Sequence, residues 1–276
     1  MRVRKRLLQC ALFCVLIGSV WVFVLLSHVR EVDAFSLDKV IYDNREGMNS
    51  SCPLDVLSQK FSYIGHGSQA IAFEGEDKKT VLKCFLKKKI SGEKVYKIPS
   101  LCDWIPSWRR EKVIRKQQKK EKKISSLVQS YSSAFSHLKE ETGLIAIHLS
   151  ATEGQYPVCS VRDFRGKEFL LDLDRASFVV QSKATIVRDV YNSLQTEEEK
   201  TSFFQAMETL LERRAQKGFK DLGQGRVFEF NYGFLEDKAI LFDVGRLVYS
   251  EEVAMDPLPE IQKMQSRLYA RFNHPR

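Results

Sequence analysis

Two short stretches decide the fold: residues 61–73, with the sequence FSYIGHGSQAIAF, and residues 80–85, with the sequence TVLKCF. Their apolar runs have the length and the content of β-branched and aromatic residues that are typical of strands. The sequence therefore predicts three consecutive strands, with a glycine-containing loop at residues 65–70 and a polar turn at residues 74–79.

The glycine loop and the third strand together indicate a site for a phosphorylated ligand. Gly65 and Gly67 carry no Cβ, so the backbone amides of the loop can approach a polyphosphate closely. Lys83, in the third strand, can reach the same phosphates. A strand follows the glycines and no Gly-Lys-Ser/Thr sequence ends the loop, which excludes the Rossmann and Walker motifs. Glycines at an ordinary strand turn are the alternative interpretation.

The carboxyl-terminal third carries a second ordered group of polar residues. A helix is predicted from Thr196, where Thr-Glu-Glu-Glu has the pattern of a capping box, to about Gly218. Two short strands are predicted between positions 230 and 242. The polar group along this part of the chain consists of Asp221, Asn231 and the triplet Asp243-Val-Gly245.

The order of these motifs resembles the protein-kinase fold, in which a glycine loop, a strand lysine, a helix, an aspartate, an asparagine and an Asp-x-Gly triplet follow one another. The resemblance implies an α+β domain with an antiparallel small lobe, a hinge at residues 178–183 and a short helical second lobe. It implies that ATP and Mg²⁺ bind, with Asp221 as the catalytic base beside Lys83. The helix glutamate that pairs with the lysine would be Glu111 or Glu121. The implied nucleotide-binding residues are Gly65, Gly67, Lys83 and Glu111, and the implied metal ligands are Asn231 and Asp243.

Three features depart from the kinase pattern. Asp221 precedes Asn231 by ten positions, whereas the kinase loop H-R-D-x-x-x-x-N has five. Ala70 replaces the third loop glycine, and only 31 residues follow Gly245. We therefore expect an atypical kinase or a pseudokinase that binds a nucleotide or another phosphate ligand. The alternative is a non-catalytic interaction protein of the cell envelope or the host interface.

Three stretches, at residues 138–145, 231–234 and 239–246, also resemble a family of membrane-anchored proteins from obligate intracellular bacteria. The resemblance covers most of the chain beyond the amino-terminal segment. It implies the same kinase-like order of motifs and carries no established activity.

The amino-terminal segment predicts a single membrane span. Residues 7–26 are 20 uncharged, mainly apolar residues, which as a helix would be about 30 Å long. Four basic residues lie within residues 1–6, and this asymmetry places the amino terminus in the cytoplasm and the remainder outside it. A cleaved signal peptide is the alternative, although its apolar core is usually about 7–15 residues long.

A basic helix is predicted within residues 107–141, which contain neither Gly nor Pro and repeat apolar residues at helical spacing. Arg109–Lys123 contains nine basic and two acidic residues, a difference of +7, against +9 for the whole chain. Such a segment can contact anionic lipid or a protein partner, or can be a solvated helix face. Nucleic acid is not an expected partner, because the domain is predicted to lie outside the cytoplasm.

The remaining predictions concern domain bounds and the cysteines. A linker is predicted at residues 27–55, a small-lobe-like region at 56–183 and a reduced large-lobe-like region at 184–276. Residues 49–51 match a glycosylation sequon. No Cys-x-x-Cys pair has the spacing of a zinc site, so the cysteines are either free or paired in one of three ways. The cysteines outside the apolar run are Cys52, Cys84, Cys102 and Cys159.

Overall fold

The computed structural model describes residues 40, 47–67, 69–86, 115, 122, 125–223 and 227–272. All of them belong to one compact unit, residues 40–276. The predicted membrane span at residues 7–26 lies outside the described residues, and no helix among those described is long and apolar enough to cross a bilayer. Most of Arg109–Lys123 also lies outside, although Arg115 and Lys122 are described and are helical.

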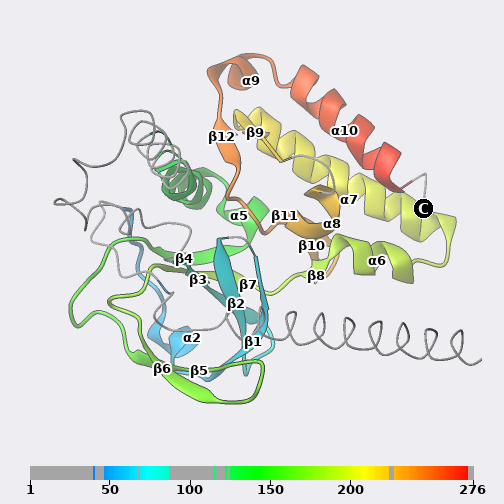
Figure 1. Ribbon diagram of the computed structural model, residues 1–276. Coiled ribbons are helices and arrows are strands. Elements are labelled where there is room, and N and C mark those ends of the chain that lie inside the picture. The colour runs from blue at the N-terminus through cyan, green and yellow to red at the C-terminus, as the bar shows by residue number, and fades with distance from the viewer. Residues whose placement is uncertain are drawn as a thin grey trace, which may run out of the picture. The chain divides into compact units, whose positions relative to one another are not determined.

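The described chain has an α+β fold, as predicted, with a seven-stranded sheet in the order β4-β7-β3-β2-β1-β5-β6 (Figure 1). Neighbouring strands are antiparallel except β1 and β5, which run parallel over two residue pairs. The strands are β1 (Phe61–His66), β2 (Ala70–Gly75), β3 (Thr80–Phe85), β4 (Leu144–His148), β5 (Val158–Arg162), β6 (Glu168–Asp172) and β7 (Phe178–Ser182).

The three predicted strands around the glycine loop are β1, β2 and β3. The pairing of β1 with β2 shifts register between Tyr63 and Gly65, which leaves Ile64 in a bulge. Beyond the bulge the loop closes tightly, because the amide of Gly67 donates to the carbonyl of Ala70 at 2.8 Å. Strand β7 pairs with β3 on one side and with β4 on the other, and it contains residues 178–182 of the hinge predicted at residues 178–183.

The predicted helix at residues 107–141 is divided in the structure. Residues 125–137 are helical, Leu138 interrupts the helix, and α5 (Lys139–Thr142) follows and ends at Gly143, whose φ is +64°. The helical segment 125–137 contacts both the sheet and the carboxyl-terminal part of the chain. The rings of Tyr131 and Phe85 lie 5.0 Å apart, and the hydroxyl of Ser130 donates to the carbonyl of Leu247 at 2.6 Å.

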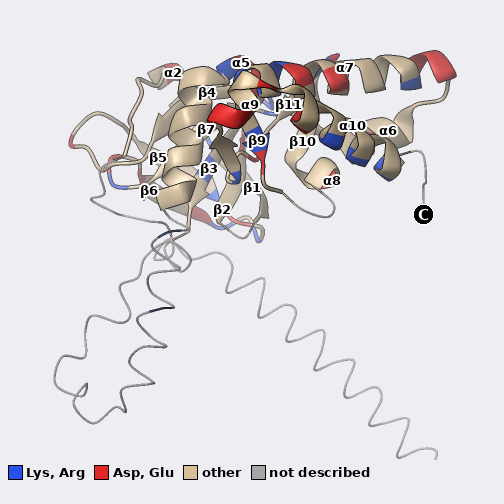
Figure 2. Cartoon of the chain, turned by 90° about the horizontal axis from the view of Figure 1, so that it is seen from above, with Lys and Arg blue, Asp and Glu red and all other residues tan. Residues whose placement is uncertain are grey.

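The carboxyl-terminal part consists mainly of helices, with α10 lying along α7 (Figure 1). The capping box predicted at Thr196 is confirmed, because Thr196 and Glu199 exchange hydrogen bonds at the start of α7. Acidic residues lie in the first turns of α7 and α9, where their negative charges interact favourably with the positive end of the helix dipole (Figure 2). The helices are α6 (Val187–Ser193), α7 (Glu197–Gln216), α8 (Val227–Asn231), α9 (Glu251–Met255) and α10 (Leu258–Phe272).

Two small antiparallel sheets lie beside these helices. One has the order β11-β10-β8 and contains the hairpin that was predicted between positions 230 and 242. The other pairs β12 with β9. Their strands are β8 (Thr185–Ile186), β9 (Phe219–Asp221), β10 (Tyr232–Leu235), β11 (Lys238–Leu241) and β12 (Leu247–Tyr249).

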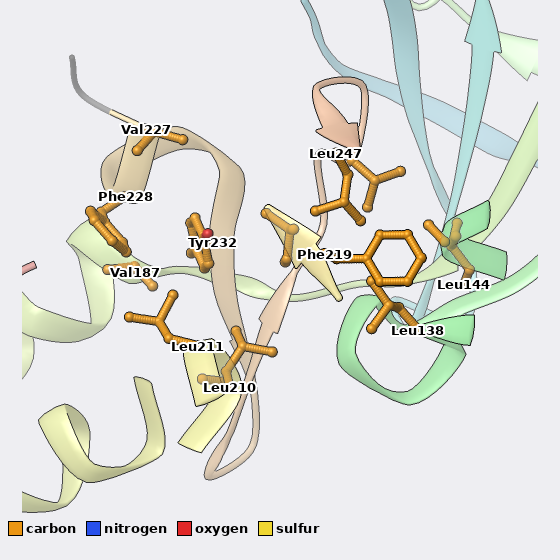
Figure 3. Close-up of a cluster of buried hydrophobic side chains, with 14 of the residues drawn as sticks. Leu138, Leu144, Val187, Leu210, Leu211, Phe219, Val227, Phe228, Tyr232 and Leu247 are labelled. Atoms are coloured by element: carbon orange, nitrogen blue, oxygen red, sulfur yellow. The ribbon is translucent and has the colours of Figure 1, made fainter. Parts of the chain in front are cut away.

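A continuous apolar core joins these elements. It includes Phe85 from the sheet, Leu138 from the chain before α5, Leu211 from α7 and Leu268 from α10, all nearly or completely buried. In Figure 3 the ring of Phe219, from β9, points toward Leu138. The sheet and the helical part therefore share one core, which fixes the elements that carry the polar residues described below.

The predicted linker at residues 27–55 reaches too far along the chain. The amide of Ser50 donates to the carbonyl of Ile147 at 2.8 Å, so residues 47–50 lie against β4. The side chain of Asn49 accepts from the amide of Leu149 at 2.8 Å and donates to the carbonyl of Ser150 at 3.0 Å. The side chain of Asn49, the asparagine of the sequon, therefore fixes its segment against the residues that follow β4. The short helix α2 (Leu54–Leu57) follows.

The described cysteines are Cys52, Cys84 and Cys159, and all three are buried free thiols. Of the two interpretations left open by the sequence, free thiols are correct for these three residues. Cys102 lies outside the described residues.

Candidate functional site

Lys83 lies where the seven-stranded sheet meets the end of β11. Its ammonium group donates to the carbonyl oxygen of Phe242 at 2.7 Å and to Oε1 of Gln181 at 2.7 Å. It also lies 5.0 Å from the centre of the Phe242 ring. Lys83 and Phe242 are 159 positions apart in the chain, so the tertiary fold brings them together.

Asp243 and Asn231 are neighbours through their backbones. The amides of Phe242 and Asp243 both donate to the carbonyl of Asn231, at 2.8 and 3.2 Å. The carboxylate of Asp243 accepts from the amide of Gly245 at 3.2 Å, and its side chain is exposed. The structure therefore brings together three of the predicted site residues, Lys83, Asn231 and Asp243.

The glycine loop approaches the Asp-Val-Gly triplet at Gly245. A Cβ placed on Gly245 would lie 2.7 Å from Oε1 of Gln69 and 3.0 Å from Cδ1 of Leu127. Gln69 belongs to the loop, and Leu127 belongs to the helical segment 125–137. Gly245 therefore lies against both the loop and that helical segment.

The fold itself does not require glycine at positions 65 and 67. A Cβ on Gly65 would meet nothing within 4 Å, and a Cβ on Gly67 would meet only the carbonyl oxygen of Ala70, at 3.9 Å. Neither residue has a left-handed φ. Both backbone positions are thus open to a ligand, which is the feature that the sequence predicted from these glycines.

Burial determines the electrostatics of Lys83. It lowers the pKa of the Lys83 ammonium group from 10.5 to about 8, and the nearby Asp243 carboxylate opposes this shift. No carboxylate among the described residues forms an ion pair with Lys83 within 4.0 Å. Burial and Asp243 both raise the pKa of Tyr131, which lies on the helical segment 125–137.

Lys83 should make the stability of the protein depend on pH. Its folded pKa of about 8 lies below the unfolded value of 10.5, so the unfolded chain binds more protons between these values. The free energy of unfolding should therefore rise with pH in this window, by roughly 2–3 kcal/mol relative to a Lys83→Met variant. Urea unfolding of both proteins from about pH 7 to about pH 10.5 tests this. Parallel curves for the two proteins would contradict the assignment.

Asp221, the predicted base, has a different environment from the other site residues. It ends strand β9, where the sequence predicted a loop, and is only 4% exposed. Its Oδ1 accepts from the amide of Gly223 at 2.6 Å, and its Oδ2 accepts from the hydroxyl of Tyr232 at 3.1 Å. Arg214 Nη1 lies 3.9 Å from the same Oδ2. These are the surroundings of a structural carboxylate.

The remaining predictions are the metal ligands and the glutamate that pairs with Lys83. Glu111 and Glu121 both lie outside the described residues. Within the described part of the chain, no three His, Cys, Asp or Glu side chains gather as metal ligands. Asn231 and Asp243 are a pair of oxygen donors, which suits Mg²⁺ when waters and phosphate oxygens of a ligand complete its coordination.

Sequence reasoning missed Gln181 and Gln69. Gln181 is 1% exposed and is the lysine's side-chain partner. The signal that could have revealed it is an amide within the otherwise apolar run Phe178-Val-Val-Gln181, since buried polar groups need partners. Gln69 had no comparable signal, because its position beside Gly245 depends on how the loop closes.

No protein-family model and no curated protein matches the chain. Among solved structures, the chain is similar to one described as "High resolution (2.2 A) crystal structure of WbdD", with a TM-score of 0.37 and 12% sequence identity. The similarity covers 77% of this chain and 41% of that chain, so this chain spans about two-fifths of the length of WbdD. A similarity at this TM-score does not establish a shared fold or a shared function.

Proposed function

We propose that this chain is a membrane-anchored, kinase-like protein that binds a nucleotide by its phosphates, between the glycine loop and the Asp243–Gly245 triplet. The observation that carries the proposal is the 2.7 Å hydrogen bond from Lys83 to the carbonyl of Phe242. It places the strand lysine beside Asp243, and these are the two charges that contact phosphate and metal in a kinase-like site.

The order of elements supports a two-lobed, kinase-like arrangement. Strands β1–β3 carry the glycine loop and the lysine, the helical segment 125–137 follows, and β4 and β7 then return to pair beside β3. Strand β7 leads directly into β8 and the helical part. The chain thus passes from a sheet lobe to a helical lobe at residues 183–184, at the end of the predicted hinge.

Each residue of the site would have a separate task when a nucleotide binds. The loop amides around Gly65 and Gly67 would donate to phosphate oxygens, and Lys83 would neutralise their charge. Asn231 and Asp243 would hold Mg²⁺, which would bridge the phosphates. The environment of Asp221 supports binding without Asp221 as a base, as in a pseudokinase.

The test is binding of magnesium-ATP to the full-length chain in detergent micelles, measured by calorimetry. We expect saturable binding that a Lys83→Met variant weakens by roughly 30-fold, because charge-assisted hydrogen bonds contribute about 1.5–3 kcal/mol. Lys79→Met is the matched control, since Lys79 is exposed in the turn that leads into the same strand. It should bind ATP as the unmodified chain does.

Two results would overturn the proposal. One is the absence of saturable binding up to millimolar ATP. The other is equal affinity of the Lys83→Met variant and the unmodified chain, with circular dichroism showing that both are folded. Repeating the titration in about 0.5 M salt separates a specific pocket from surface attraction, because exposed charges are strongly screened there.

A further inference from the structure

Gln181 is a polar side chain within a buried strand, and both ends of its amide are occupied. Its Nε2 donates to the carbonyl of Thr142 at 2.5 Å, and its Oε1 accepts from the ammonium of Lys83 at 2.7 Å. In the pairing of β3 with β7, Gln181 is opposite Val81 and Lys83 is opposite Val179. Gln181 and Lys83 are therefore diagonal neighbours on one face of the sheet.

The two contacts fix the direction of the amide. Thr142 is the last residue of α5, and its carbonyl can only accept a hydrogen bond, so the NH₂ group of Gln181 must face it. The opposite orientation would direct the NH₂ group at the Lys83 ammonium. The amide oxygen therefore points at Lys83, and this neutral acceptor is anchored to the end of a helix.

We propose that Gln181 is the positioning residue of Lys83, which holds its ammonium at the carbonyl of Phe242, directly before Asp243. In the kinase-like scheme a helix glutamate has this role. This role rests on the proposed function for its biological meaning, because Gln181 would orient the lysine of the proposed nucleotide site.

A neutral partner has a consequence for the ligand. Among the described residues, three groups face Lys83: the amide of Gln181 from β7, and the carbonyl of Phe242 and the carboxylate of Asp243 after β11. None of them is a carboxylate in direct contact with the ammonium. Within the described part of the chain the positive charge of Lys83 is thus not neutralised by a carboxylate in contact, and it can attract an anionic ligand. Phosphate oxygens are the anions to which the neighbouring loop would offer amide donors.

The experiment is the pH profile of Lys83 acetylation in the full-length chain. Trace acetic anhydride is added from about pH 6 to about pH 11, and the peptide that contains Lys83 is quantified by mass spectrometry. The unmodified chain should show a midpoint of about 8. In Gln181→Glu the new carboxylate should raise the midpoint by roughly 1–3 pH units and so reduce acetylation at pH 8 by at least about fivefold.

Gln181→Met gives the opposite change from the same position. It removes the acceptor for the charged form of Lys83, so the midpoint should fall below that of the unmodified chain. A side chain that only fills space would not move the midpoint in opposite directions in the two variants. Gln59→Glu is the matched control, because Gln59 makes side-chain hydrogen bonds to Val56 and Asp77 and none to Lys83. It should leave the midpoint unchanged.

The outcomes separate this inference from the proposed function. Unchanged midpoints in both Gln181 variants would overturn the positioning role, even if magnesium-ATP binds. Shifted midpoints together with absence of ATP binding would confirm the positioning role and overturn the nucleotide site. If Gln181→Glu does not fold, the fall expected in Gln181→Met decides the question alone.

Discussion

Replacing Arg214 by Ala should lower the free energy of unfolding by about 3–5 kcal/mol, because it leaves the buried carboxylate of Asp221 without a counter-charge and leaves Glu260 with Lys263 alone. Arg214 is 1% exposed and lies on α7. Its Nη2 is 2.9 Å from Oε1 of Glu260, and its Nη1 donates to the hydroxyl of Tyr232 at 2.9 Å. The hydroxyl of Tyr232 in turn donates to Asp221. The guanidinium of Arg214 therefore lies near two buried carboxylates, those of Glu260 and Asp221.

Urea unfolding measures this effect, and an exposed ion pair supplies its control. Lys200 pairs with Glu197 on the surface of the same helix, with side-chain exposures of 36% and 85%. Lys200→Ala should change the free energy of unfolding by less than about 0.5 kcal/mol. A loss below about 1 kcal/mol in Arg214→Ala would show that the cluster is not held as described.

The Arg214 result also bears on Asp221. If the cluster is as stabilising as expected, substitution of Asp221 should reduce activity of any kind by unfolding the protein. A measurement of stability must therefore accompany each test of Asp221 as a base.

The second large effect should come from the glycine loop. In a Gly65→Ala, Gly67→Ala double variant, magnesium-ATP affinity should fall about 100-fold, because two methyl groups would occupy the space where phosphates approach the backbone. Stability should be unchanged or slightly higher, since neither Cβ meets a close neighbour and alanine has less backbone freedom in the unfolded chain. Calorimetric titration and thermal unfolding of the same samples give both values.

Gly218→Ala is the reciprocal control for the loop variant. Gly218 has a φ of +81°, and a Cβ there would lie 2.6 Å from the ring of Tyr249. This variant should lose stability by about 1–2 kcal/mol, because its φ is left-handed and its Cβ would meet Tyr249. It should bind ATP normally, because Gly218 follows the end of α7 and is not part of the glycine loop. Equal stability losses in the two variants would contradict the conclusion that Gly65 and Gly67 are free of structural constraint.

The sequence predicted the elements whose formation depends on neighbouring residues in the chain. The hairpin strands around Gly65 follow from runs of β-branched and aromatic residues, and the start of α7 follows from Thr196 and Glu199. Lys83 and Asp243 were also predicted as members of one site, through the order of the motifs. The structure places them close enough that Asp243 influences the pKa of Lys83.

The features that the sequence did not predict share a different cause. The burial of Asp221 depends on Arg214 and Tyr232, which come from other elements of the fold, so no window around Asp221 reveals it. The role of Gln181 depends on which strands flank β7. Asn49 has the polar, turn-like neighbours of a linker, yet it pairs with the edge of β4. In each case the partner is distant in sequence, and only the tertiary fold identifies it.

The buried free thiols have a consequence for the chemistry that the described domain can tolerate. Burial raises the pKa of Cys52 to about 11 and the pKa of Cys159 to about 12, and it also raises the pKa of Cys84. Because only thiolates react readily with oxidants and disulfides, roughly one Cys52 in ten thousand is reactive at pH 7. These three residues should therefore resist oxidation and disulfide exchange while the domain is folded. The described fold can consequently persist in reducing and in oxidising surroundings alike.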